Sequence, residues 1–292
     1  MRVLLLGGEG FIGRHIGAAL AARGHCVLPC GRRLETLVTP QAWEPLLQGV
    51  DAAVNAVGIL RERRRETYDA IYRAAPAALA TICRQRKLRF IHVSALGLHA
   101  GARSRFILSK LAGERAIADA GSDYSIVRPS LVDGDGGFGA RWLRRMARWP
   151  VHFTPADALG RIAAVDARDV GEAIAVVCEL PGAEWRNVEL GGQTLRTMRE
   201  YLAALRPTHM RPARHVTVPA WLARVASHLC DAAHFSPFSF GHLELMRRDN
   251  APRVNHLPAL LGRAPAAVGN TLTDPRRPAR SRTAPLCGGR AS

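Results

Sequence analysis

Lysine is almost absent from this sequence. Of its 41 lysines and arginines only Lys87 and Lys110 are lysine, although the 292-residue chain carries a formal net charge of +17. The arginines are spread along the whole chain, which suits a compositional bias of the source genome better than a dedicated cluster of cations for nucleic-acid phosphates. We therefore expect no nucleic-acid partner, whereas weak peripheral attraction to an anionic membrane surface follows from the same charge.

Long apolar runs and paired cysteines are also missing. No run approaches the roughly 18–20 apolar residues that cross a bilayer, and the apolar start of the chain breaks into glycines too early for a signal peptide. The six cysteines form no C-x-x-C pair, which favours a reducing, cytoplasmic setting, with any peripheral attachment at the inner membrane. His228, Cys230 and His234 lack the spacing of zinc ligands, so no metal site is expected.

Strand and helix signals alternate through the first half of the chain, which predicts an α/β fold: a Rossmann-like, doubly wound parallel sheet with a smaller C-terminal α/β lobe. The predicted strands are residues 2–8, 25–32, 50–58, 89–97, 124–132, 185–192 and 214–219. The predicted helices are residues 11–24, 40–49, 68–87, 104–114, 140–150, 166–181, 194–207 and 220–233. We expect a nucleotide-binding domain over 1–132, with a strand and a helix returning from 160–195, a substrate or partner lobe over 133–272, and a disordered tail over 273–292.

The stretch GGEGFIG joins the first predicted strand to the first predicted helix. Gly7, Gly10 and Gly13 are spaced as G-x-x-G-x-x-G, with Phe11 and Ile12 between the last two. Glycine permits the tight turn and the close approach of a pyrophosphate, and the helix N-terminus supplies oriented N–H groups. This context predicts a dinucleotide site.

The end of the second predicted strand distinguishes the two common dinucleotides. An acidic residue there accepts the ribose 2′-hydroxyl of NAD, whereas an arginine holds the 2′-phosphate of NADP. The sequence places Arg32 and Arg33 at this point, and the first acidic residue is Glu35. We expect NADP(H), with NAD as the alternative.

Several motifs together carry a family resemblance. In chain order they are GGEGFIG, VNAVGIL, FIHVSALG, SKLAGE, IVRPSLVDGDGGFG and VDARDVGEAI, mainly within residues 1–200. This set resembles the extended and atypical short-chain dehydrogenase/reductases of the NAD-dependent epimerase/dehydratase type. It is most similar to the branch that contains the nucleotide-binding accessory subunit of respiratory complex I and its bacterial relatives.

The resemblance implies roles for individual residues. Catalytic members carry Y-x-x-x-K on the helix, and here Lys110 matches the lysine that bonds the nicotinamide ribose while Phe106 stands in place of the tyrosine. Ser94 matches the serine that orients the substrate. The resemblance also implies cofactor contacts from Pro129 and from a four-residue stretch made of Asn55, Ala56, Val57 and Gly58. Residues 34–50 form only a short stretch, and the aspartate that usually follows a third strand and contacts adenine is not found there.

A phenyl ring neither donates nor accepts the catalytic proton, so several functions stay open. Lys110 can hold the ribose of NADP(H) in a protein with weak or no oxidoreductase activity, linked to respiratory or quinone metabolism through an unknown small-molecule or protein partner. Alternatively, Ser94, Ser104, Ser109 or a water replaces the tyrosine in an active NADP-dependent reductase or a nucleotide-sugar epimerase/dehydratase. The third interpretation is a dinucleotide-sensing regulator, and the simplest is a helix on which Phe106 and Lys110 only pack.

Overall fold

The computed structural model describes residues 1–31, 33–233 and 238–269. Arg32, residues 234–237 and residues 270–292, which include the whole predicted tail, lie outside this description. Among the described helices none is both long and apolar enough to cross a membrane. The same part of the chain contains no cluster of three or more His, Cys, Asp or Glu side chains suited to a metal ion.

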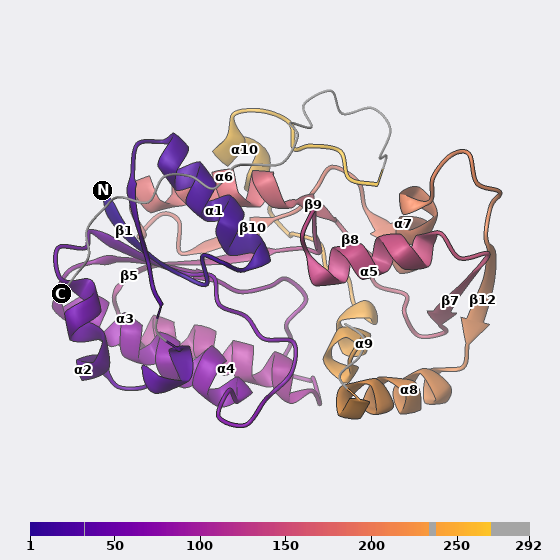
Figure 1. Cartoon of the computed structure of the whole chain (residues 1–292), viewed down its shortest axis with the longest axis horizontal. Coiled ribbons are helices and arrows are strands. Elements are labelled where there is room, and N and C mark those ends of the chain that lie inside the picture. Colours follow the sequence, from indigo (N-terminus) through magenta and orange to yellow (C-terminus); the bar gives the residue numbers. More distant parts are fainter. Residues whose placement is uncertain (32, 234–237, 270–292) are drawn as a thin grey trace.

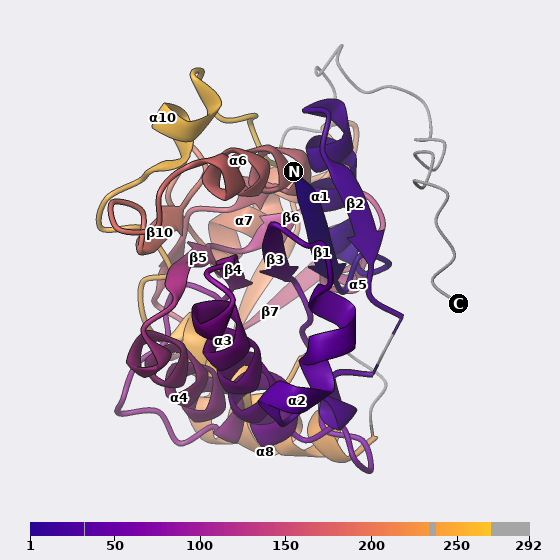
Figure 2. The same cartoon turned by 90° about the vertical axis from the view of Figure 1, so that its left-hand side faces the viewer.

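A parallel sheet of six strands forms the centre of the first half, and it confirms the predicted fold class (Figures 1 and 2). Its order is β10-β5-β4-β3-β1-β2. The strands are β1 (Arg2–Leu6), β2 (Cys26–Pro29), β3 (Ala52–Asn55), β4 (Arg89–Val93), β5 (Asp123–Pro129) and β10 (Asn187–Leu190). Buried aliphatic residues at both faces of these strands explain why helices cover the sheet on each side.

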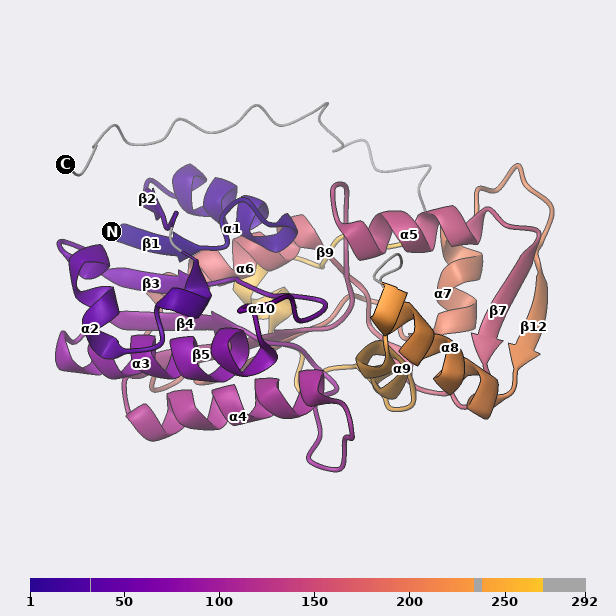
Figure 3. The same ribbon diagram turned by 60° about the horizontal axis from the view of Figure 1, so that its bottom comes forward.

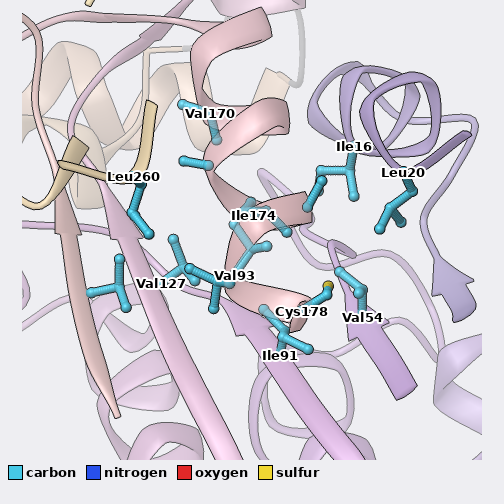
Figure 4. Packing of buried hydrophobic residues seen from close by; sticks show 14 of the residues in the cluster. Ile16, Leu20, Val54, Ile91, Val93, Val127, Val170, Ile174, Cys178 and Leu260 are labelled. Carbon is cyan, nitrogen blue, oxygen red and sulfur yellow. The ribbon is translucent and has the colours of Figure 1, made fainter. Parts of the chain in front are cut away.

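One face of the sheet packs against α1 (Phe11–Ala22), α6 (Ala167–Glu179) and α10 (Leu257–Leu261). Figure 4 shows this core, in which Val54, Ile91 and Val127 from the strands meet Ile16 of α1 and Ile174 of α6. Helix α6 begins where the sequence predicted. The side chain of Asp166 caps it by accepting from the backbone N–H of Arg168.

The other face carries α2 (Pro40–Trp43), α3 (Ala75–Gln85) and α4 (Arg105–Ala120), with short 3₁₀ turns at Leu34–Thr36 and Glu44–Leu47. A π-helical turn, Ala70–Ala74, precedes α3 inside the helix predicted over 68–87. Every residue from 33 to 51 is described and none is in a strand, so β2 is the edge of the sheet. No strand of the described chain therefore lies beyond β2, where the adenine-contacting aspartate of the family would follow one.

The second part of the chain lies beyond one end of the sheet, at the right of Figures 1 and 3. Its elements are β6 (Val132–Asp133), α5 (Phe138–Ala147), β7 (Val151–Pro155), β8 (Arg161–Ile162), β9 (Val165–Asp166), β11 (Arg196–Thr197), α7 (Met198–Leu205), β12 (Arg214–Val218), α8 (Ala220–Ala233) and α9 (Phe240–Met246). Three two-stranded sheets pair β11 with β8, β12 with β7 and β6 with β9. Strands β7, β8, β9 and β11 and helices α9 and α10 were not predicted from the sequence, and β11 replaces the start of the helix predicted over 194–207.

This second part contacts the sheet at the carboxyl ends of β4 and β5. The amide Nδ2 of Asn250 donates to the carbonyl of Leu96, just after β4. The hydroxyl of Ser130, just after β5, donates to the carbonyl of Asn250 and accepts from the N–H of Ala163. These bonds attach the second part of the chain beside the carboxyl ends of the strands, where doubly wound sheets bind their ligands.

Candidate functional site

The glycine motif forms the turn between β1 and α1, and its spacing has steric causes. Gly7 has a φ of +74°, and a Cβ there would lie 3.0 Å from the backbone of Ala56 at the end of β3. A Cβ on Gly13 would overlap the carbonyl of Gly7. The N–H of Gly10 donates to that same carbonyl over 2.9 Å. The turn therefore holds the start of α1 directly against the sheet.

The N-terminus of α1 presents backbone donors to this crevice. Its N-cap, Gly10, makes no side-chain cap, and no acidic residue lies in the first turn. The N–H groups of Phe11, Ile12 and Gly13 belong to this first turn, where a helix leaves its donors without intrahelical partners. Together with the positive end of the helix dipole they suit an anion such as a pyrophosphate. The ring of Phe11 itself packs on the loop at Gly137.

The stretch after β3 is shaped by the Asn55 side chain. Its Oδ1 accepts from the N–H of Val57 over 3.1 Å, and its amide nitrogen lies 3.2 Å from Nδ1 of His92. Burial, then the charges of Lys110 and Arg128, lowers the pKa of His92 to about 3, so this imidazole is neutral and accepts from the amide. Asn55 therefore stabilises the turn at Val57.

Phe106 is held in a cage of aromatic rings. Its ring centroid lies 5.8 Å from that of Tyr68, 5.6 Å from that of Tyr72 and 5.7 Å from that of His242 on α9. The Tyr68 hydroxyl donates to the carbonyl of Leu60, and the Tyr72 hydroxyl bonds the backbone N–H and carbonyl of Ile59. Burial raises both tyrosine pKa values, that of Tyr68 to about 12. Neither hydroxyl is available to replace the missing one.

Lys110 lies one helical turn from Phe106 and is 7% exposed. Its Nζ is 4.1 Å from the centre of the Tyr72 ring, close enough for a cation–π contact. Burial lowers the pKa of Lys110 to about 8, while Glu114 opposes the shift. Glu114 is itself bound by the Arg128 guanidinium, at 2.7 Å. Within the described residues Lys110 forms neither an ion pair nor a side-chain hydrogen bond, because Arg128 binds the neighbouring carboxylate of Glu114.

Ser94 provides a second polar group without a partner. It follows β4 directly, and its N–H donates to the carbonyl of Val127 over 2.7 Å. Its hydroxyl is buried and has no hydrogen-bond partner among the described residues. Pro129 ends the neighbouring strand β5, and its carbonyl accepts from the N–H of Leu96. The structure thus places Ser94 and Pro129 at adjoining carboxyl ends of the sheet.

A basic pocket of about 550 Å³ opens near the end of β2. Its lining residues are Arg33, Glu35, Arg63, Arg64, Arg65 and Glu66. The Arg33 guanidinium is exposed and lies 3.9 Å from the Glu35 carboxylate. Backbone bonds between Arg63 and Glu66 form the turn, and Arg64 adopts a φ of 45°. The three consecutive arginines were missed in the sequence, where the run RERRRE was their only signal. The predicted Arg32 lies outside the described residues.

The comparisons with known proteins agree with this architecture. The family model described as RmlD substrate binding domain matches residues 1–154. Ceramide reductase of Caulobacter vibrioides is 28% identical over 194 residues, which cover 61% of each chain. The mitochondrial NADH dehydrogenase [ubiquinone] 1 alpha subcomplex subunit 9 of Dictyostelium discoideum is 28% identical over 151 residues, or 51% of this chain and 42% of that protein. The chain thus spans less than two thirds of the length of these relatives.

Solved structures of low identity share the fold. A nucleoside-diphosphate-sugar epimerase from Staphylococcus aureus aligns with a TM-score of 0.71 at 16% identity, covering 94% of this chain and all of that one. RMD from Pseudomonas aeruginosa, complexed with NADPH, aligns with a TM-score of 0.60 at 17% identity over 92% and 94% of the two chains. UDP-glucuronic acid 4-epimerase from Bacillus cereus, complexed with NAD, aligns with a TM-score of 0.61 at 15% identity over 92% and 95%.

The matched model covers the β1 turn, β4 and the α4 helix, which are the elements that assemble the site. The Dictyostelium discoideum relative is a subunit of complex I, the branch that the sequence motifs resembled. The identities of both relatives leave the particular reaction and the choice of nucleotide open. The chain belongs to the RmlD substrate binding domain family, within the NAD(P)-binding atypical short-chain dehydrogenase/reductases of the NAD-dependent epimerase/dehydratase type.

Proposed function

We propose that this protein binds NADP(H) and that its Phe106 site lacks the tyrosine-based proton transfer of its catalytic relatives. The observation that carries this proposal is Lys110: a buried ammonium with no ion pair in the described structure, next to a ring without a hydroxyl. Burying a cation without a partner is costly, and a buried group with a perturbed pKa is a candidate for ligand binding. Ribose hydroxyls are such acceptors.

The residues present fit a dinucleotide at each of its polar parts. The N–H groups at the start of α1 suit the pyrophosphate, and Lys110 with the unpartnered Ser94 hydroxyl suits the nicotinamide ribose and its neighbourhood. The basic pocket suits a 2′-phosphate, because Arg33 and Arg63–Arg65 line it together. Glu35 in the same pocket is the group that would favour NAD, by accepting a 2′-hydroxyl.

The physiological role follows from the absent hydroxyl. A bound nicotinamide supplies or accepts hydride, but a carbonyl substrate also needs a proton, and Phe106 gives none. The likeness to the NADH dehydrogenase subunit of Dictyostelium discoideum supports a role as a nucleotide-holding partner near the respiratory and quinone system. The missing tyrosine counts against nucleotide-sugar epimerase or dehydratase activity, although several structures of the same fold have those names.

A second function is favoured by the pKa of Lys110, which burial lowers to about 8. An ammonium with that pKa can itself give a proton to a carbonyl oxygen near neutral pH. Bound NADPH would supply the hydride to the carbonyl carbon, and Lys110 would supply the proton to the carbonyl oxygen, which together give an alcohol. Solvent would then return the proton to the lysine. The relative from Caulobacter vibrioides, named ceramide reductase, favours a lipid substrate for such a reaction.

Nucleotide titration tests the first function. Purified wild type is titrated with NADPH and with NADH by fluorescence, alongside Lys110→Met and the matched control Lys87→Met at the only other lysine, which is exposed. We expect NADPH to bind wild type and the control alike, and Lys110→Met to bind about tenfold or more weakly because one charge-assisted bond is worth about 1.5–3 kcal/mol. The proposal is refuted if wild type binds neither NADPH nor NADH.

Turnover separates the two functions. We expect wild type to oxidise NADPH negligibly with carbonyl substrates and Phe106→Tyr to gain activity, since the ring then carries a proton donor. Turnover by wild type that is lost in Lys110→Met, with NADPH binding retained, would instead establish the lysine as the proton donor.

A further inference from the structure

Helix α8 exposes its large apolar side chains to solvent and buries its small ones, the reverse of what is expected for a helix that only packs on its own domain. Its small residues Ala223 and Ser227 are buried, at 4% and 0% exposure. Its large apolar residues point outward, with exposures from 42% to 68%. They are Trp221, Leu222, Val225 and Leu229. The spacing of Trp221, Val225 and Leu229 by four residues places these three on one face.

The helix is fixed in this orientation by contacts on its other side. The Asp231 carboxylate accepts from the Arg61 guanidinium at 3.1 Å and from the N–H of Phe240 at 3.0 Å. The ring of His228 stacks on that of Phe240 with centroids 4.6 Å apart. The Arg61 side chain is 9% exposed, so this ion pair is well shielded. Rotation of α8 to bury its apolar face would break these contacts.

More apolar surface lies at the same end of the molecule. Strands β7 and β12 pair in parallel, and Phe153 stands opposite Val216 in their register. Both side chains are exposed, Phe153 by half, whereas His152 and His215 pack together on the opposite face of the pair. Figures 1 and 3 place β7, β12 and α8 together at the end away from the six-stranded sheet. We call the four exposed apolar side chains of α8 the α8 surface.

Arginine outnumbers acidic residues in the chain around the α8 surface. Residues 206–230, which contain β12 and most of α8, have four arginines and no aspartate or glutamate: Arg206, Arg211, Arg214 and Arg224. The last three are exposed. Residues 136–156, which contain β7, also have four arginines and no acidic residue. The acidic residues that follow these two segments, Asp157 and Asp231, are each paired with an arginine, Arg247 and Arg61.

We propose that the α8 surface binds an anionic lipid bilayer, with α8 lying in the plane of the interface. Outward tryptophan, leucine and valine suit the boundary between headgroups and acyl chains, and the surrounding arginines suit anionic headgroups. A second copy of this chain fits poorly, because a two-fold contact places the same arginines opposite one another. The bilayer supplies both the apolar phase and the opposite charge that this surface lacks. The inference does not depend on nucleotide binding.

Vesicle co-sedimentation of the full chain tests the proposal. Vesicles of equal parts phosphatidylglycerol and phosphatidylcholine are compared with phosphatidylcholine alone, for wild type, Trp221→Ser with Leu229→Ser, and the control Val254→Ser, which alters a side chain 63% exposed outside the α8 surface. We expect wild type and the control to bind the anionic vesicles alike, and more weakly as salt is raised. The double variant should bind about tenfold or more weakly, since each buried CH₂ is worth about 0.8 kcal/mol.

The outcomes are decisive in both directions. Tryptophan emission that shifts to the blue on anionic vesicles in wild type, and no longer does so in Trp221→Ser, supports insertion of this helix. Equal binding of wild type and double variant overturns the proposal, as does equal binding to neutral vesicles. A concentration-dependent dimer that the double variant abolishes, with no vesicle binding by wild type, overturns it in favour of a second copy. Thermal melting of both variants checks that they stay folded.

Discussion

The buried ammonium of Lys110 predicts that removing it stabilises the nucleotide-free protein. Burial lowers the pKa of Lys110 from its ordinary value of 10.5 to about 8. The difference between these pKa values corresponds to about 3 kcal/mol at pH 7, where the lysine is charged in both folded and unfolded chains. The cation–π contact with Tyr72 returns about 1–2 kcal/mol of this. We therefore expect Lys110→Met to raise the free energy of unfolding by about 1–3 kcal/mol.

The pH dependence gives this prediction its sign. Between about pH 8 and pH 10.5 the unfolded chain binds the proton that the folded chain has released, so wild-type stability rises with pH over this range. Met has no proton to lose. The stability advantage of Lys110→Met is therefore expected to be full below pH 8 and to shrink toward zero by about pH 10.5.

Guanidinium denaturation of wild type, Lys110→Met and Lys87→Met at a series of pH values from 7 to 10.5 measures the effect. Lys87 is exposed, so its replacement should leave stability almost unchanged at every pH. A Lys110→Met protein that is less stable than wild type at pH 7, or a difference that does not vary with pH, refutes the reasoning. Stabilisation accompanied by weaker NADPH binding would mark Lys110 as a residue kept for its ligand at the expense of stability.

Three further predictions concern the turn, the pocket and the buried histidine. Gly13→Ala should lower the free energy of unfolding by about 3 kcal/mol or more in thermal or chemical denaturation, because its Cβ overlaps the Gly7 carbonyl, whereas Gly139→Ala, with open space around it, should not destabilise. Arg33→Ser should weaken NADPH binding about tenfold or more and leave NADH binding nearly unchanged in calorimetric titrations; an equal loss for both would show that Arg33 does not meet a 2′-phosphate. The pKa of His92 is lowered to about 3, so below pH 6.5 the imidazole is protonated in the unfolded chain but stays neutral in the folded chain, and the folded state loses stability as the pH falls. Between pH 7 and pH 4.5 the free energy of unfolding of His92→Gln should therefore fall by about 2–3 kcal/mol less than that of wild type. Free energies of unfolding that fall equally with pH in both proteins would contradict this.

The parts of the fold that local patterns specify were predictable. The apolar run of β1, the glycines after it and the start of α6 all appear where the sequence placed them, because turn geometry and helix starts depend on residues within a few positions. The helix of residues 220–233 was also predicted at the bounds that α8 has. Strand β7 was not, because it exists through its pairing with β12 some sixty residues later.

The site divides in the same way. Lys110 and Phe106 could be placed on one helix face from their spacing of four. The rings that enclose Phe106 come from Tyr68, from Tyr72 in the π-helical turn and from α9. Arg63–Arg65 meet Arg33 only because the turn after β3 folds back toward the end of β2. No pattern in a single stretch of sequence shows such a meeting.

The sequence by itself determined the nucleotide-binding half of the protein, because the strand, glycine turn and helix there depend on local residues. It also showed that Lys110 matches the family lysine and that Phe106 replaces the family tyrosine. The tertiary structure decided what those residues experience. It buried the Lys110 ammonium away from any carboxylate partner in the described chain, engaged both nearby tyrosine hydroxyls, and turned the apolar side of α8 outward. The physical reason is that periodicity identifies which residues share a face, whereas burial and pKa depend on what other segments bring against that face.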